Sequence, residues 1–267
     1  MMKFLHIHPL QTSFILIIGY ALWFILPAFF IDIPLTTESL SEINNILRQW
    51  TTQLIILAAL ILIITYLGWW REIGFRPIHS GGLKFLLPPF LFLAVLFLLL
   101  LPEYKHSGLF GGFENVKQIF SFLLILLMLG FTEETVFRGI LFHGLETKVT
   151  PLQTVLISAI IFGLFHYLNM LVGAHFYTTT YQVIHAAASG FMYATLRLRI
   201  GAIWPIMIFH TIWDIGLILL TSIEHPKMNH AQVVMSFSFS HAILIAIPAI
   251  SYGIFVYWRW TRYSNKN

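Results

Sequence analysis

The sequence predicts an all-α membrane protein, a polytopic bundle of about eight transmembrane helices with both the N- and the C-terminus in the cytoplasm. Three observations predict it. Of the 267 residues, 58% are hydrophobic and only 10% are charged, whereas a soluble domain carries about 25% charged residues. Apolar stretches long enough to cross about 30 Å of hydrocarbon recur along the chain. The Lys and Arg residues between them favour alternate loops, as the positive-inside rule requires.

Eight apolar stretches define the predicted spans, seven of full transmembrane length and one slightly shorter. They cover residues 10–31, 53–70, 85–101, 118–142, 152–172, 181–196, 202–220 and 234–258. The first is too long for a signal-peptide core and lacks an A-x-A-like cleavage site, so we interpret it as a true span. We find no internal repeat, low-complexity tract or second domain. Residues 1–267 are therefore predicted to form a single transmembrane domain.

The charges of the loops predict the orientation. With the N-terminus inside, the cytoplasmic segments carry ten basic residues and the opposite side four, with Arg138 left out as intramembrane. The ten are Lys3, Arg71, Arg76, Lys84, Lys148, Arg197, Arg199, Arg259, Arg262 and Lys266. A missed or extra span would destroy this alternation.

Two local patterns predict details of the bundle. Ser39-Leu40-Ser41-Glu42 has the capping-box pattern, which predicts the start of an interfacial helix on the outer face. Pro88 and Pro89 fall inside the third apolar stretch, where they are predicted to kink or break the span.

Composition also excludes several classes of function. The chain has no cysteine, which excludes disulfides and thiolate metal sites. The pI is near 9.3, but no basic stripe is interleaved with exposed aromatic residues, so we predict no nucleic-acid partner. The lipid bilayer is the predicted partner.

The fourth span carries charges that a lipid environment penalises. Glu133, Glu134 and Arg138 follow a long apolar run, and each charge costs roughly 3 kcal/mol on insertion scales. Glu134 and Arg138 are four residues apart, so a helix lets them pair. Glu133 points about 100° away from Glu134, which leaves it available for another role.

Two further spans carry intramembrane polar residues. The fifth contains Phe162-Gly163-Leu164-Phe165-His166, and the seventh places His210 and Asp214 one turn apart. The predicted topology puts Glu133, His166, His210 and Asp214 roughly 12 to 21 Å from the cytoplasmic boundary, near the middle of the bilayer. This set suits hydrolysis: Glu133 can take a proton from water, and the imidazoles can orient that water or bind a metal.

The three motifs together resemble the CPBP family, named from CAAX proteases and bacteriocin-processing enzymes and also called the Abi family. They are Glu-Glu-x-x-x-Arg at Glu133–Arg138, Phe-x-x-x-His at Phe162–His166 and His-x-x-x-Asp at His210–Asp214. The resemblance covers about residues 118–220 as the catalytic core. It implies an intramembrane endopeptidase whose partner is a peptide or membrane-protein substrate. The eukaryotic members of the family remove the last three residues of prenylated proteins.

The resemblance also implies roles for the residues. Glu133 becomes the general base that activates water, His166 shares that water, and His210 and Asp214 stabilise the oxyanion. The supporting pair is Glu134 and Arg138. A carboxylate stabilises an oxyanion only if it holds a proton or supports another donor, and Asp214 leaves both possibilities open.

The cofactor stays open at this point. The family is often labelled metalloprotease, and Glu133, His166 and His210 are the ligands that a Zn²⁺ ion would use. No His-Glu-x-x-His helix is present, and a metal-free glutamate mechanism explains the motifs equally well.

Two other functions compete with the peptidase. One is a non-proteolytic membrane scaffold or bacteriocin-immunity protein that retains the motifs. The other is a transporter that relays protons at mid-membrane; its expected repeat symmetry between halves is missing here. The compact loops and the lack of targeting signals are typical of a bacterial plasma membrane, where a prenylated CAAX substrate is not expected.

Overall fold

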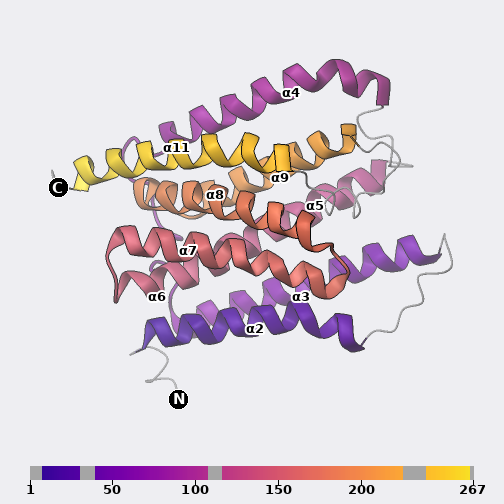
Figure 1. The fold of residues 1–267 in the computed structure, drawn as a ribbon. Helices are drawn as coiled ribbons and strands as arrows, with labels where there is room; N and C mark the ends of the chain where they lie inside the picture. The colour runs from indigo at the N-terminus through magenta and orange to yellow at the C-terminus, as the bar shows by residue number, and fades with distance from the viewer. Residues whose placement is uncertain (1–7, 31–39, 108–115, 225–238, 265–267) are drawn as a thin grey trace.

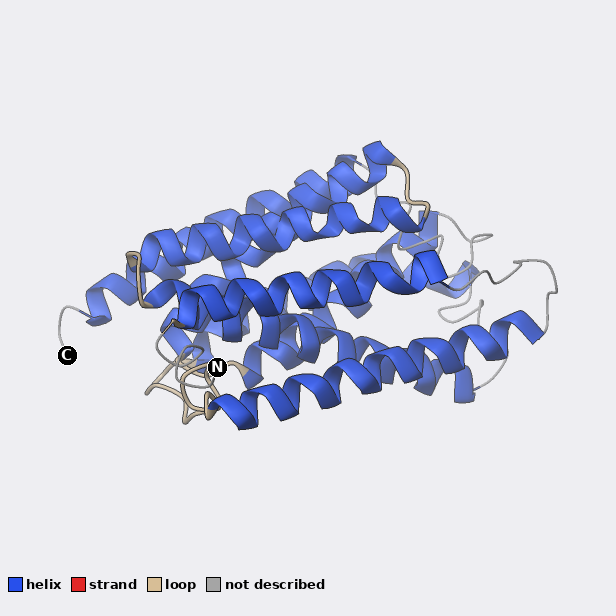
Figure 2. Cartoon of the chain, turned by 90° about the horizontal axis from the view of Figure 1, so that it is seen from below, coloured by secondary structure: helices blue, strands red, loops and turns tan. Residues whose placement is uncertain are grey.

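The chain folds into a bundle of long, roughly parallel helices, as Figures 1 and 2 show from two directions. The computed structural model describes residues 8–30, 40–107, 116–224 and 239–264. Within these ranges there is no strand. The predicted all-α fold class is confirmed.

Each predicted span overlaps one long helix. These helices are α2 (Pro9–Phe30), α3 (Leu40–Leu67), α4 (Leu87–Ser107), α5 (Val116–Glu134), α7 (Pro151–Phe165), α8 (Phe176–Ile200), α9 (Trp204–Glu224) and α11 (Phe239–Ser264). Short elements extend or join them: the 3₁₀ turns η1 (Leu83–Leu86) and η3 (His166–Val172), the π-helical turn η2 (Thr135–Leu141) and α6 (Phe142–Glu146).

Several of these helices are long and apolar enough to cross a bilayer. Among the described residues four segments meet that standard, namely Trp50–Leu67, Ile119–Glu146, Pro151–Leu171 and Ala242–Ser264. Pro9–Ile25 and Leu83–Leu99 are shorter apolar helices. Large apolar side chains on the outside of the bundle, such as Leu62 and Leu99, are about 70% exposed, which is where lipid would cover them.

The prediction that Pro88 and Pro89 disrupt a span is wrong. The apolar run from residue 85 begins with the 3₁₀ turn η1, and α4 begins only at Leu87. Both prolines therefore occupy the first turn of α4, where the missing N–H would have had no helical partner and the fixed φ suits the helix.

The capping-box residues also differ from the expectation. Leu40 begins α3, which continues without a break to Leu67. The segment thus opens the helix of the second span and forms no separate interfacial helix, while Ser39 lies outside the described residues.

The arrangement of helices places α8 at the centre. It packs along α11 on one side and α7 on the other, and α5 packs against α9. Small residues permit this closeness: a Cβ on Gly163 of α7 would stand 2.7 Å from the Cβ of Ala187 on α8.

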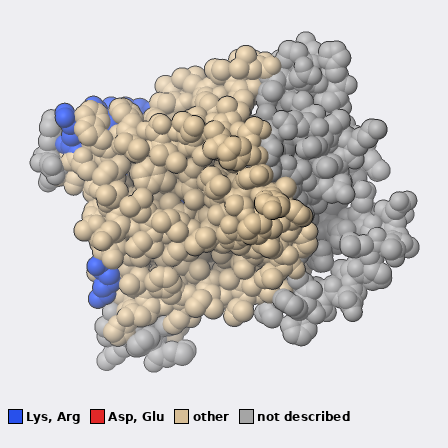
Figure 3. All heavy atoms as spheres, in the orientation of Figure 1, with Lys and Arg blue, Asp and Glu red and all other residues tan. Residues whose placement is uncertain are grey.

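The first and last described helices are consistent with the predicted placement of both termini on the same side of the membrane. The start of α2 and the end of α11 lie at the same end of the bundle in Figure 1. On the face drawn in Figure 3, the described Lys and Arg residues gather at that end as well. Placement of this end in the cytoplasm remains a prediction from the positive-inside rule.

Candidate active site

The first motif lies where α5 gives way to the π-helical turn η2. Glu133 and Glu134 are the last residues of α5, and Arg138 lies within η2. The Thr135 hydroxyl donates to the carbonyl of Phe131 (2.7 Å), so it is satisfied within the helix itself. Wide π-turns inside helices are frequent at functional sites, and this one carries Arg138 directly after the two glutamates.

The predicted ion pair is present and completely buried. Arg138 Nη1 donates to Glu134 Oε1 over 2.9 Å, and both side chains are 0% exposed. The same Glu134 oxygen accepts a second hydrogen bond of 2.8 Å from Nδ1 of His210 on α9. Glu134 therefore joins Arg138 to the third motif, a contact between residues 76 positions apart that the sequence did not reveal.

His210 presents its other nitrogen to two carboxylates. Nε2 lies 3.4 Å from Oδ2 of Asp214 and 3.8 Å from Oε2 of Glu133. The His210 side chain is 5% exposed, Glu133 13% and Asp214 22%. Glu133 and Asp214 are thus partly accessible to solvent. Glu134 and Arg138 are completely buried.

His166 lies at the C-terminal end of α7, where the α-helix ends and η3 begins. Its Nδ1 is 2.9 Å from the carbonyl oxygen of Phe162. A carbonyl only accepts, so Nδ1 carries the proton and Nε2 keeps its lone pair. Among the described residues His166 makes no hydrogen bond or ion pair with Glu133; its edge-to-face neighbour is the Phe162 ring, with centroids 5.0 Å apart. Phe162 also touches His210 edge-on, at 5.9 Å.

Two aromatic rings enclose the guanidinium of Arg138. Its Cζ lies 4.0 Å from the centroid of Phe162 and 5.2 Å from that of Tyr193 on α8. Tyr193 in turn packs against the His210 ring at 4.9 Å. Cation–π contacts of this kind are strongest in a desolvated site. Sequence reasoning missed Tyr193 because no motif contains it.

Gly190 makes room for this arrangement. A Cβ at that position would lie 2.8 Å from Arg138 Nη2 and 3.0 Å from Cδ1 of Phe162. We expect Gly190→Ala to displace the guanidinium and lower the free energy of unfolding by about 1–3 kcal/mol, the usual cost of overpacking. Thermal unfolding in detergent measures this.

Gly19 on α2 is the matched control for that substitution. A Cβ there would meet nothing within 4 Å, so Gly19→Ala should leave stability unchanged or raise it slightly. Equal melting temperatures for the two variants would contradict the close packing at Gly190.

The side chains do not form a metal site. Within the described ranges no three His, Cys, Asp or Glu side chains are grouped so that they could hold an ion. The Nδ1 hydrogen bonds of His210 and His166 leave Nε2 of each ring available, as in many metal-bound histidines. As placed among the described residues, however, Glu133, His166 and His210 do not converge on one point, as the three protein ligands of a Zn²⁺ site must.

Comparison with known families bears directly on this segment. Residues 115–216 match the family model described as "Type II CAAX prenyl endopeptidase Rce1-like". All three motifs lie within the matched residues. The comparison with curated proteins and the comparison with solved structures gave no match.

The family match supports an intramembrane endopeptidase in general, and with the apolar helices it points to an integral membrane protein. Residues 115–216 of the chain are thus similar to the Rce1-like CAAX endopeptidases, and this match is consistent with the CPBP family that the three motifs resemble.

Proposed function

We propose that this protein is an intramembrane endopeptidase that hydrolyses a peptide bond of a membrane-associated protein or peptide with a water activated by Glu133. The main support is that the two adjacent glutamates differ in burial and in partners. Glu134 is sealed and holds both Arg138 and His210, whereas Glu133 is partly exposed beside His210 Nε2. Of these two glutamates, only Glu133 can contact a water molecule and a substrate.

The proposed reaction uses Glu133 as the base. Its carboxylate takes a proton from water as the oxygen attacks the scissile carbonyl carbon, and it then gives this proton to the amine that leaves. His166 accepts a hydrogen bond from the same water through Nε2, because its Nδ1–H is fixed on the Phe162 carbonyl.

His210 is the proposed oxyanion donor. Glu134 accepts from its Nδ1 and holds the ring, while Asp214 lies 3.4 Å from Nε2. Asp214 then acts by supporting protonation of His210, and this avoids placing a bare carboxylate against an oxyanion. Donors fixed in advance in a dry site commonly contribute 10²–10³-fold to turnover.

The location that we propose is a bacterial plasma membrane, supported by the short links between the helices. A substrate from the same membrane would reach the site laterally, between helices. We leave its prenylation as an experimental variable, since the Rce1-like match and a bacterial location favour opposite answers.

Membrane proteomics tests the proposal and identifies the substrate in the same experiment. Cells that express the wild type are compared with cells that express Glu133→Ala at equal abundance. We expect at least one membrane-associated precursor to accumulate in the variant, with the shorter product missing. An unchanged peptide profile together with retained biological activity would instead favour the scaffold or immunity function.

A further inference from the structure

A group of cations without acidic partners lies at the end of the bundle where α11 ends. It consists of Lys84 on η1, Arg199 on α8 and Arg259 on α11, and we call it the basic cluster. Lys84 and Arg259 are exposed, whereas Arg199 is only 6% exposed. In the described part of the chain none of the three forms an ion pair with a carboxylate.

Arg199 is the unusual member of the basic cluster. Its guanidinium lies between two rings, with Cζ 4.7 Å from the centroid of Phe85 and 4.4 Å from that of Tyr263. Its Nε and Nη1 are buried and have no hydrogen-bond partner among the residues that the structure describes. A buried cation left in this state is costly unless an anion completes the site. Lys84 approaches the same Phe85 ring, at 5.7 Å.

The electrostatic potential around the cluster is positive. His79 lies between α3 and η1, outside the spans, and donates its backbone N–H to the carbonyl of Ile200 beside Arg199. Burial lowers the pKa of the His79 imidazole, and the guanidiniums of Arg76, Arg197 and Arg199 lower it further. An anion bound here would be attracted by several fixed charges at once.

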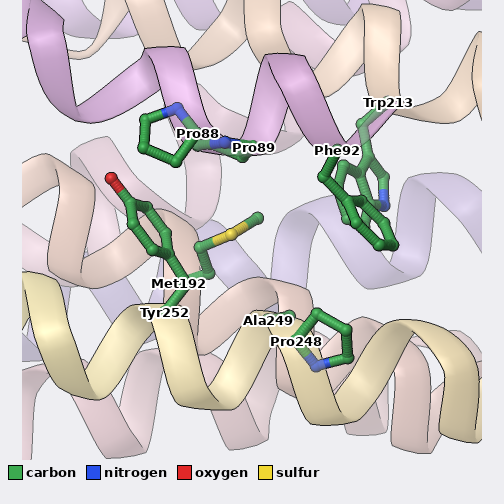
Figure 4. A pocket seen from close by; sticks show the side chains of 8 residues that line it. All are labelled: Pro88, Pro89, Phe92, Met192, Trp213, Pro248, Ala249 and Tyr252. Atoms are coloured by element: carbon green, nitrogen blue, oxygen red, sulfur yellow. The ribbon is translucent and has the colours of Figure 1, made fainter. Parts of the chain in front are cut away.

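An apolar cavity of about 150 Å³ adjoins the cluster on its membrane side. Figure 4 shows Pro88, Pro89 and Phe92 of α4 facing Pro248 and Ala249 of α11 across it. The cavity is partly open and its lining is almost entirely apolar, so a small apolar group can enter it. A segment of one hydrocarbon chain matches that size and chemistry.

Phe85 and Tyr252 connect the cavity to the basic cluster. Tyr252 lines the cavity, and its hydroxyl donates to the carbonyl of Phe85 (2.7 Å). Pro88 and Pro89 follow Phe85 by one helical turn. Apolar side chains around this junction are exposed on the outside of the bundle, among them Leu87 (59%) and Phe255 (44%). A ligand with an anionic head and an apolar tail would therefore satisfy both features together.

We propose that an anionic phospholipid binds here, with its phosphate on the basic cluster and one acyl chain in the cavity between α4 and α11. The position fits a lipid of the cytoplasmic leaflet, where basic pockets between transmembrane helices bind anionic headgroups. The inner wall of the cavity includes Trp213, the residue before Asp214. The bound chain would therefore pack directly behind the candidate active site.

Native mass spectrometry of the full-length protein tests this proposal. The protein is equilibrated with equal amounts of dioleoyl phosphatidylglycerol and dioleoyl phosphatidylcholine, and the retained lipid is counted. We expect at least tenfold preference for phosphatidylglycerol. Arg199→Gln should reduce that retention about tenfold, and Arg199→Lys should restore part of it. Arg71→Gln, which removes an exposed cation outside the cluster, is the matched control and should change nothing.

A second variant tests the acyl chain independently. Ala249→Phe fills the cavity and should abolish retention of the lipid, whether or not Arg199→Gln folds. Equal retention of both lipids, or unchanged retention in Ala249→Phe, would overturn the proposal. Displacement by inorganic phosphate at millimolar concentration would assign the cluster to a soluble anion, and displacement by a farnesylated peptide would assign the cavity to substrate. Either result would also overturn it.

Discussion

Glu133→Gln is expected to lower kcat of the purified protein by about 10²–10⁴-fold, the range that a general base contributes. The amide has nearly the same shape but cannot take a proton from water. KM should change little, because the other side chains of the site should keep their positions. His210, for example, is held by Glu134 at 2.8 Å and lies 3.8 Å from Glu133. A quenched peptide that spans the cleavage site of the accumulated precursor provides the assay.

The control for this variant is Glu72→Gln, which removes the same charge from an exposed loop position. It should retain full turnover. Both variants should unfold close to the wild-type temperature. Without the Glu133 charge, His210 keeps Glu134 and Asp214 as carboxylate partners, and the Glu72 side chain is exposed. A Glu133→Gln protein with kcat within twofold of the wild type would remove the carboxylate from the mechanism.

Local spacing explains what could be predicted from the sequence. The pair Glu134–Arg138 is an i, i+4 contact, which depends only on helix geometry, and the structure contains it at 2.9 Å. The same rule brings His210 to Asp214. Apolar length located the helices, since the bilayer fixes how many residues a span requires.

Contacts between helices were beyond sequence reasoning, because spacing along one helix says nothing about the rotation of its neighbour. The bond from His210 to Glu134 depends on how α9 faces α5. Tyr193 reaches Arg138 only because Gly190 lets α8 approach. The tautomer of His166 was equally beyond sequence reasoning, because it depends on the end of α7, where Nδ1 lies 2.9 Å from the carbonyl oxygen of Phe162.

The prediction for Pro88 and Pro89 failed for a different reason. An apolar run does not mark where a helix begins, because hydropathy does not distinguish a 3₁₀ turn from the first turn of an α-helix. The start of α4 at Leu87 converts a predicted kink into an N-terminal signal.

The second large effect concerns Glu134. One of its carboxylate oxygens, Oε1, accepts hydrogen bonds from both Arg138 and His210. We expect Glu134→Gln to lower the free energy of unfolding by about 3–5 kcal/mol, because it leaves a buried guanidinium without a counter-ion. Protein abundance and melting temperature should both fall. Turnover should fall as well, since His210 would lose its charged acceptor.

A double variant separates these two consequences. In Glu134→Gln with Arg138→Met, no buried charge is left unpaired, so the melting temperature should recover toward the wild-type value. Turnover should not recover, because Nδ1 of His210 would still face an amide in place of a carboxylate. If the two substitutions lower the melting temperature additively, Glu134 and Arg138 are not energetically coupled, and the ion pair does not stabilise the fold. If the double variant instead regains turnover, the role of Glu134 is limited to neutralising Arg138, and His210 must be positioned by its packing against Phe162 and Tyr193.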